Sequence, residues 1–74
     1  MRAREVVREI TRRGGYFTRQ VGSHARYRAE YTKPDGTTGQ VDTAVAMHPR
    51  DIPIGTLRRI EKDLEPAFGR GWLR

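Results

Sequence analysis

The spacing of apolar residues along the chain predicts two helices with three strands between them. Between residues 3 and 13 apolar side chains recur every three or four positions, which indicates a helix with one apolar face. The pair Gly14-Gly15 supplies the backbone conformation that ends such a helix. A second apolar stripe at helical spacing, over residues 53–64, predicts the other helix.

Three segments between the helices show patterns typical of strands. Residues 16–21 are rich in aromatic and β-branched side chains. In residues 25–32 alanine and tyrosine alternate with charged side chains, and in residues 39–47 an inner face that includes Met47 alternates with a more polar one. Short connections favour antiparallel pairing, so we expect an α+β domain of α-β-β-β-α order, with two helices on one face of a three-stranded sheet.

The segment after the second helix, residues 66–74, has no periodic pattern. Pro66 disfavours helix at the residue before it, so the helix is expected to end near Leu64. Phe68 and Trp72 either fold back onto the core or contact a partner, and the sequence leaves both alternatives open. A chain of 74 residues has room for a single small domain, over residues 1–74, with a modest core.

The charge of the chain is uneven and points to a polyanionic partner. The net charge is +6, and residues 1–28 hold eight arginines against two glutamates, which accounts for all of it. A nucleic acid is the first candidate, followed by an anionic membrane and an acidic protein. No apolar run approaches the roughly 20 residues that a membrane span needs, and no secretory signal is apparent, so we expect a cytoplasmic protein.

His24 is the candidate for acid–base chemistry. The chain has no cysteine and two histidines, and His24 follows Gly22-Ser23 in a predicted turn between two arginine-containing strands. An imidazole beside arginines is suited to proton transfer on a phosphodiester. On spacing alone, an exposed turn histidine without a role is the more frequent case.

Two sequence motifs favour a functional role for His24 over an exposed histidine without one. Residues 19–24, Arg-Gln-Val-Gly-Ser-His, resemble the R-Q-x-G-S-H signature of the HicA family of mRNA interferase toxins. Residues 48–60 are similar to that family's H-x-x-D-[IL]-x-x-G-T-L-R-x-I segment, and the resemblance extends over about residues 4–64. It implies a fold like that of double-stranded-RNA-binding domains, a ribonuclease that cleaves mRNA, neutralisation by a HicB antitoxin, and a catalytic role for His24.

The remaining site residues are expectations built on this resemblance and on the charge. No carboxylate cluster has metal-ligand spacing, so we expect metal-independent cleavage without a cofactor, with His24 acting as general base or as general acid. Ser23 has the alternative of a plain turn residue. For Gly55-Thr56, in the first turn of the second helix, the alternative to phosphate binding is that Gly55 merely permits close packing. A non-catalytic RNA-binding module and a basic interaction protein are the rival functions. The expected RNA contacts are Arg12, Arg19, Ser23, Arg26 and Thr56.

Overall fold

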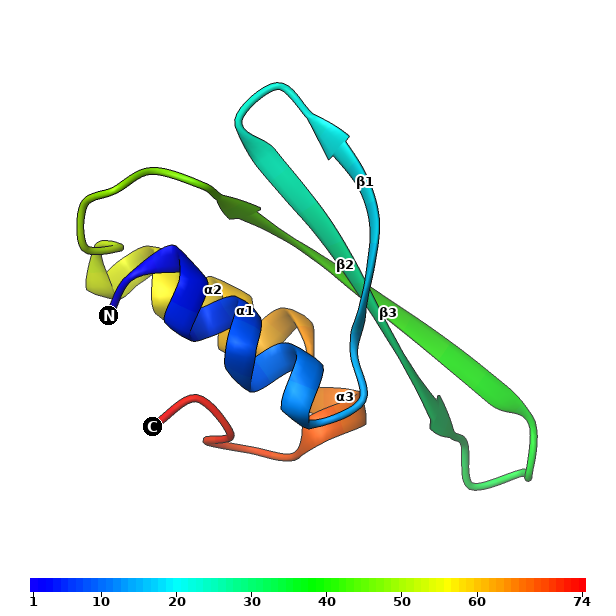
Figure 1. The fold of residues 1–74 in the computed structure, drawn as a ribbon. Coiled ribbons are helices and arrows are strands. Elements are labelled where there is room, and N and C mark those ends of the chain that lie inside the picture. The colour runs from blue at the N-terminus through cyan, green and yellow to red at the C-terminus, as the bar shows by residue number, and fades with distance from the viewer.

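The computed structural model describes residues 1–74, and its elements follow the predicted α-β-β-β-α order (Figure 1). The three strands form one antiparallel sheet in the order β1-β2-β3. The predicted α+β class is therefore confirmed, and the layout is consistent with a fold like that of double-stranded-RNA-binding domains. The elements are α1 (Ala3–Arg12), β1 (Tyr16–Val21), β2 (His24–Thr32), β3 (Thr38–Ala46), α2 (Ile54–Asp63) and the single-turn α3 (Glu65–Phe68).

Two glycines at the end of α1 let the chain turn directly into β1. Gly14 has a φ of +98°, a conformation that residues with a side chain rarely adopt. Gly15 lies so close to the helix that a Cβ there would overlap the side chain of Ile10. Because of this close approach, β1 begins at Tyr16, beside the end of the helix.

One face of the sheet carries the buried side chains. Along β2, Ala25, Tyr27 and Ala29 are buried. Their neighbours Thr43 and Val45 in β3 are buried too, since the register places Thr43 opposite Tyr27 and Val45 opposite Ala25. This alternation is the one predicted from the sequence, and it defines an inner face that the helices cover.

Met47 does not continue this inner face, and the prediction that it does is wrong. β3 ends at Ala46, one residue earlier than expected. The N–H of His48 donates to the carbonyl of Ala46 at 3.0 Å, so the backbone turns out of the sheet there. Met47 is consequently 40% exposed.

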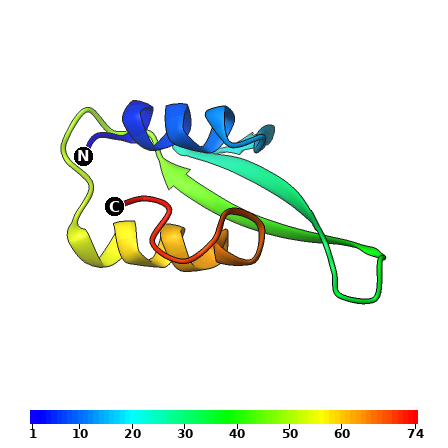
Figure 2. The same cartoon turned by 90° about the horizontal axis from the view of Figure 1, so that it is seen from below.

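Helices α1 and α2 both cover the inner face of the sheet (Figure 2). The largest fully buried side chains come from α1, β3, α2 and the residue that follows α2: Val6, Ile10, Val45, Ile60 and Leu64. Apolar burial of this kind is the main force that holds a sheet and its helices together. No helix covers the opposite face, which we call the open face of the sheet.

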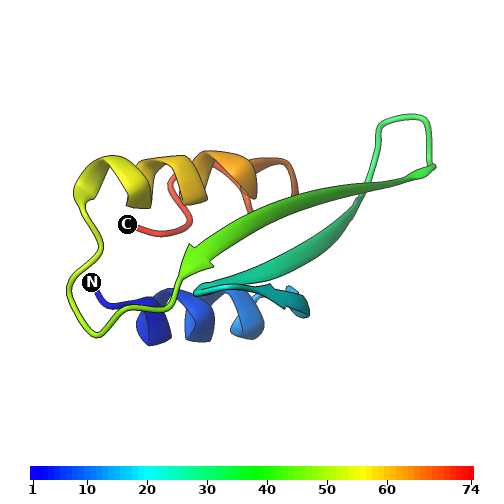
Figure 3. The same ribbon diagram turned by 90° about the horizontal axis from the view of Figure 1, so that it is seen from above.

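The C-terminal segment folds back onto the core, which settles the alternative left open by the sequence. It lies between α1 and α2 (Figures 2 and 3). Trp72 is 5% exposed, its indole N–H donates to the carbonyl of Glu61 at 2.7 Å, and its ring meets Phe68 edge to face at 5.0 Å. The chain reaches this position through α3, whose first turn accepts Pro66 because proline needs no hydrogen-bonded N–H there.

The β2–β3 hairpin extends beyond the helices (Figure 3), at the end of the sheet away from the β1–β2 turn (Figure 1). In its loop the carboxylate of Asp35 accepts hydrogen bonds from the hydroxyl and the backbone N–H of Thr37, at 2.6 and 2.9 Å. These bonds lower the pKa of Asp35 below its usual value, the hydroxyl contributing most.

Candidate functional site

The turn between β1 and β2 consists of two residues, Gly22 and Ser23, and β2 begins with His24 itself. Gly22 has a φ of +59°, which tight hairpin turns of this kind require. The carbonyl of Ser23 accepts the N–H of Met47 at 2.8 Å, so the turn is tied to the residue that follows β3. Because of these constraints, the backbone of His24 has a fixed position although its side chain is exposed.

His24 stands on the open face, in a row of three side chains across the sheet. The register pairs it with Val21 of β1 on one side and with Ala46 of β3 on the other. Directly opposed residues project from the same face, with Cβ atoms about 5 Å apart. Both neighbours are small or apolar, and the imidazole forms no hydrogen bond within the chain. It is therefore free to meet a ligand from solvent.

The next row holds two arginines that face each other. Arg19 pairs with Arg26, and Arg26 lies two residues, or about 7 Å, from His24 along β2. An irregularity in β1 between Phe17 and Arg19 makes this possible. Strict alternation after Phe17, which pairs with inner-face Tyr27, would turn Arg19 inward, whereas the bulge places it on the open face.

Neither Arg19 nor Arg26 has an anionic partner among the ion pairs of the chain. The row beyond them is different, since Arg28 donates to Asp42 at 2.8 and 3.3 Å. The hydrogen bond from Arg28, assisted by the charge of Arg26, holds the pKa of Asp42 below its usual value. Asp42 thus neutralises Arg28, and the uncompensated charge of the open face gathers at Arg19 and Arg26.

The structure brings together four of the six predicted site residues and separates Arg12 from them. Ser23, His24, Arg19 and Arg26 lie around the β1–β2 turn and on the adjoining rows. Arg12 lies at the C-terminal end of α1, on the other side of the sheet, where it forms an ion pair with Glu9 at 2.8 Å. That contact lowers the pKa of Glu9.

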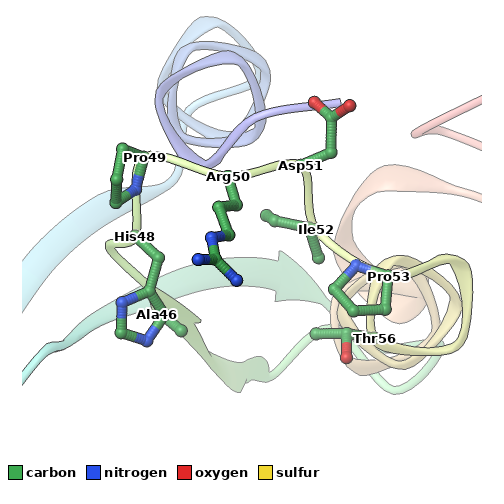
Figure 4. Close-up of a pocket in the computed structure, with 8 residues that line it drawn as sticks. All are labelled: Ala46, His48, Pro49, Arg50, Asp51, Ile52, Pro53 and Thr56. Carbon is green, nitrogen blue, oxygen red and sulfur yellow. The ribbon is translucent and has the colours of Figure 1, made fainter.

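Thr56, the sixth predicted residue, borders a hollow beside the row of His24. The hollow, of about 440 Å³, lies between the end of β3, the loop that follows it and the start of α2 (Figure 4). His48 and Arg50 line it as well. His48 entered the sequence-based prediction only as the first residue of the segment 48–60, and no role was predicted for Arg50. The only sequence feature that could have drawn attention to these two residues is that they flank Pro49, in the loop before the second helix.

No group of three or more His, Cys, Asp or Glu side chains is arranged so that it could hold a metal ion. No helix has the length and apolar character that a membrane span requires.

A comparison with protein families gives a match over most of the chain. The family model described as "HicA toxin of bacterial toxin-antitoxin" aligns with residues 3–65. Comparisons with curated proteins and with solved structures found no match. The resemblance carried by the two sequence motifs is thus confirmed. The chain belongs to the HicA toxin family and is the toxin of a toxin–antitoxin system, in which an antitoxin is its partner.

Proposed function

We propose that this toxin is an endoribonuclease that cleaves mRNA in the cytoplasm, with His24 as its catalytic residue. We further propose that a HicB-type antitoxin inhibits it by covering the open face of the sheet. One observation carries this proposal: the exposed His24, which forms no hydrogen bond in the chain, stands next to Arg19 and Arg26, two facing arginines that form no ion pair. Membership of the HicA family, whose members are generally endoribonucleases, supports the same activity.

The facing arginines favour a phosphate as the ligand of the open face. Like charges directly opposite each other destabilise a sheet, so Arg19 and Arg26 gain from an anion between or above them. A phosphate diester accepts charge-assisted hydrogen bonds from two guanidinium groups at once. Arg28 competes little for this phosphate, because its charge is already neutralised by Asp42. The bound phosphate is therefore expected one row from the imidazole of His24.

With a phosphate held there, His24 can act at either end of a cleavage reaction. As general base, the neutral imidazole takes the proton of a ribose 2′-OH while the 2′-oxygen bonds to phosphorus and the bond to the 5′-oxygen breaks. As general acid, the imidazolium gives a proton to that departing 5′-oxygen. In either role water handles the proton at the other end: it protonates the 5′-oxygen in the first case and accepts the 2′-OH proton in the second. Arg19 and Arg26 stabilise the added negative charge on the phosphorus oxygens. Neither role draws on a metal ion or a cofactor, so we propose metal-independent cleavage.

The same face suits an acidic or RNA-mimicking antitoxin surface. The chain has a net charge of +6, and on the open face its unpaired part is concentrated at the two arginines beside His24. Complementary charge accelerates association and fixes the orientation of a partner. An antitoxin seated there excludes RNA from His24 and so inhibits the toxin.

Expression of the chain is expected to stop bacterial growth and to remove full-length mRNA, and co-expression of the cognate antitoxin is expected to reverse both. The purified chain is expected to cut single-stranded RNA in the presence of EDTA, leaving 2′,3′-cyclic phosphate and 5′-OH ends. Growth curves, northern blots and end-group analysis of the products measure these outcomes. Complete loss of cleavage in EDTA contradicts the metal-independent mechanism, and harmless expression with intact mRNA removes the ribonuclease proposal altogether.

Arg26→Ala is expected to weaken RNA binding and to make it less sensitive to salt. Each phosphate contact on a single strand contributes about 0.7 to the slope of log K against log salt, so the slope should fall by about that amount. Binding is measured at several salt concentrations in the His24→Ala background, which keeps the RNA intact. The matched control is Arg28→Ala with Asp42→Ala, which removes an ion pair from the same face without changing the net charge. Equal slopes for Arg26→Ala and its parent contradict the phosphate contact.

A further inference from the structure

The hollow next to His24 is a distinct feature of the fold, and we call it the loop hollow. It is lined by eight residues from the end of β3 (Ala46), the following loop (48–53) and the first turn of α2 (Thr56). Ala46, which forms part of its wall, is the direct partner of His24 in the sheet register. Directly opposed residues have Cβ atoms about 5 Å apart, so the imidazole of His24 stands next to the Ala46 wall of the loop hollow.

The lining combines apolar walls with an unengaged guanidinium group. Ala46, Ile52 and Pro53 contribute apolar surface. The side chain of Arg50 extends from the loop toward the middle of the hollow, while the carboxylate of Asp51 turns to the other side of the loop (Figure 4). No hydrogen bond or ion pair within the chain involves the guanidinium of Arg50. Its donors and its flat face are therefore available to a ligand.

The N-terminal residues hold this loop in place before any ligand arrives. The guanidinium of Arg2 donates to the carbonyl of Pro49 at 2.8 Å, and its Nε lies 3.9 Å from Asp51. The N–H of Ile52 donates to the carbonyl of Met1 at 2.8 Å. A loop that is already ordered loses little conformational entropy when it binds, so the loop hollow is a preorganised site.

The chemistry of the lining selects among the parts of a nucleotide. A phosphate could pair with Arg50, but the apolar surface of Ala46, Ile52 and Pro53 would leave its other oxygens without hydrogen bonds, which is costly for an ionised group. A nucleobase has an apolar face and polar edges. It can stack on the guanidinium plane of Arg50 or the ring of His48, and the hydroxyl of Thr56 offers a hydrogen bond to its edge.

We propose that the loop hollow binds one unpaired nucleobase of the RNA, with Arg50 as its principal contact, next to the phosphate that His24 attacks. This inference rests on the proposed ribonuclease function and adds a base-recognition site to it. Binding of an unpaired base explains why a site beside His24 would take single-stranded RNA, since a paired base cannot enter a hollow of this kind.

The test compares nucleoside 5′-monophosphates with ribose 5-phosphate, which carries the same sugar and phosphate but no base. We expect at least one nucleotide to shift the NMR signals of Ala46 and Thr56 at concentrations where ribose 5-phosphate does not. Removing one base stack typically weakens binding about 5- to 150-fold, and Arg50→Ala is expected to lose affinity within that range. Arg50→Lys keeps the positive charge but lacks the planar guanidinium group on which a base can stack, so it is expected to lose affinity for the nucleotide too. Arg70→Ala, which removes an exposed arginine outside the hollow, is the matched control.

The outcomes separate this inference from the ribonuclease proposal. RNA cleavage with no nucleotide response at the loop hollow overturns the base site and leaves the ribonuclease in place. A nucleotide response without any cleavage leaves a base-binding hollow on a protein that does not cut. Equal responses to ribose 5-phosphate, or an Arg50→Ala variant that weakens only antitoxin binding, overturn the base site. In the second case the hollow belongs to the antitoxin interface.

Discussion

Replacing His24 with alanine is expected to abolish growth arrest and to slow RNA cleavage by about 10²–10⁴-fold, the usual contribution of a positioned proton-transfer group. The side chain is exposed and forms no hydrogen bond in the chain, so its removal takes away chemistry and leaves packing intact. RNA affinity should stay within a few-fold, because Arg19 and Arg26 are untouched. Cleavage rates at saturating RNA, together with dissociation constants, measure the two effects separately.

The matched control for this prediction is Gln40→Ala. Gln40 is exposed on the open face, in the row with Glu30 at the end of the sheet away from His24, so its loss should leave cleavage unchanged. Wild-type cleavage by His24→Ala contradicts the catalytic assignment. Growth arrest by both the wild type and His24→Ala, with RNA bound but uncut, favours the rival function, an RNA-binding module that acts by occupying its target.

The strands facing the core could be predicted because their pattern reflects a simple geometric rule. In β2, Ala25, Tyr27 and Ala29 alternate with charged residues, and a half-buried strand requires this alternation. The end of β3 could not be predicted in the same way. Met47 continues the pattern in the sequence, but the backbone leaves the sheet at Ala46, which a hydrogen bond to the β1–β2 turn helps to determine. Such long-range contacts leave no periodic signal.

The position of Arg19 shows a second limit. A bulge in β1 determines which face of the sheet this side chain occupies. Strand β1 contains no glycine or proline from which the bulge could have been predicted. The sequence likewise gives the total charge excess of residues 1–28, but it does not show which of these arginines lie together on the surface. The structure distributes its eight arginines over several surfaces: Arg2 lies near Asp51, Arg12 and Arg13 near Glu9, Arg28 pairs with Asp42, Arg4 and Arg8 form no ion pair on α1, and Arg19 and Arg26 form none beside His24. Only the last group forms the candidate site.

The loop hollow depends on contacts between distant parts of the chain. Its loop is held by Met1 and Arg2, which are about fifty residues away in the sequence. The resemblance to the HicA motif made Thr56 a candidate RNA contact, but it did not predict that Thr56 borders a hollow together with His48 and Arg50. Side-chain direction in a proline-containing loop is set by tertiary packing and not by local propensity.

Replacing Trp72 with alanine is expected to lower the free energy of unfolding by about 3–5 kcal/mol, the usual cost of removing a buried aromatic side chain. The indole fills the space between α1 and α2, donates to Glu61 and lies under the guanidinium of Arg13 at 5.9 Å. A domain of this size is typically stable by about 4–11 kcal/mol, so the loss is a large share of the total. Urea denaturation followed by circular dichroism measures it.

Arg70→Ala is the control, since an exposed side chain in the same C-terminal segment should change stability by no more than about 0.5 kcal/mol. A Trp72→Ala variant as stable as the wild type contradicts the docking of this segment. Loss of toxicity in Trp72→Ala has a different cause from loss in His24→Ala, because only the first variant loses stability and hence part of its folded population. Antitoxin binds the folded state and stabilises it by about 2.7 kcal/mol at a hundred times the dissociation constant. Co-expressed antitoxin should therefore restore folded Trp72→Ala as a complex, whereas free His24→Ala should remain folded and inactive.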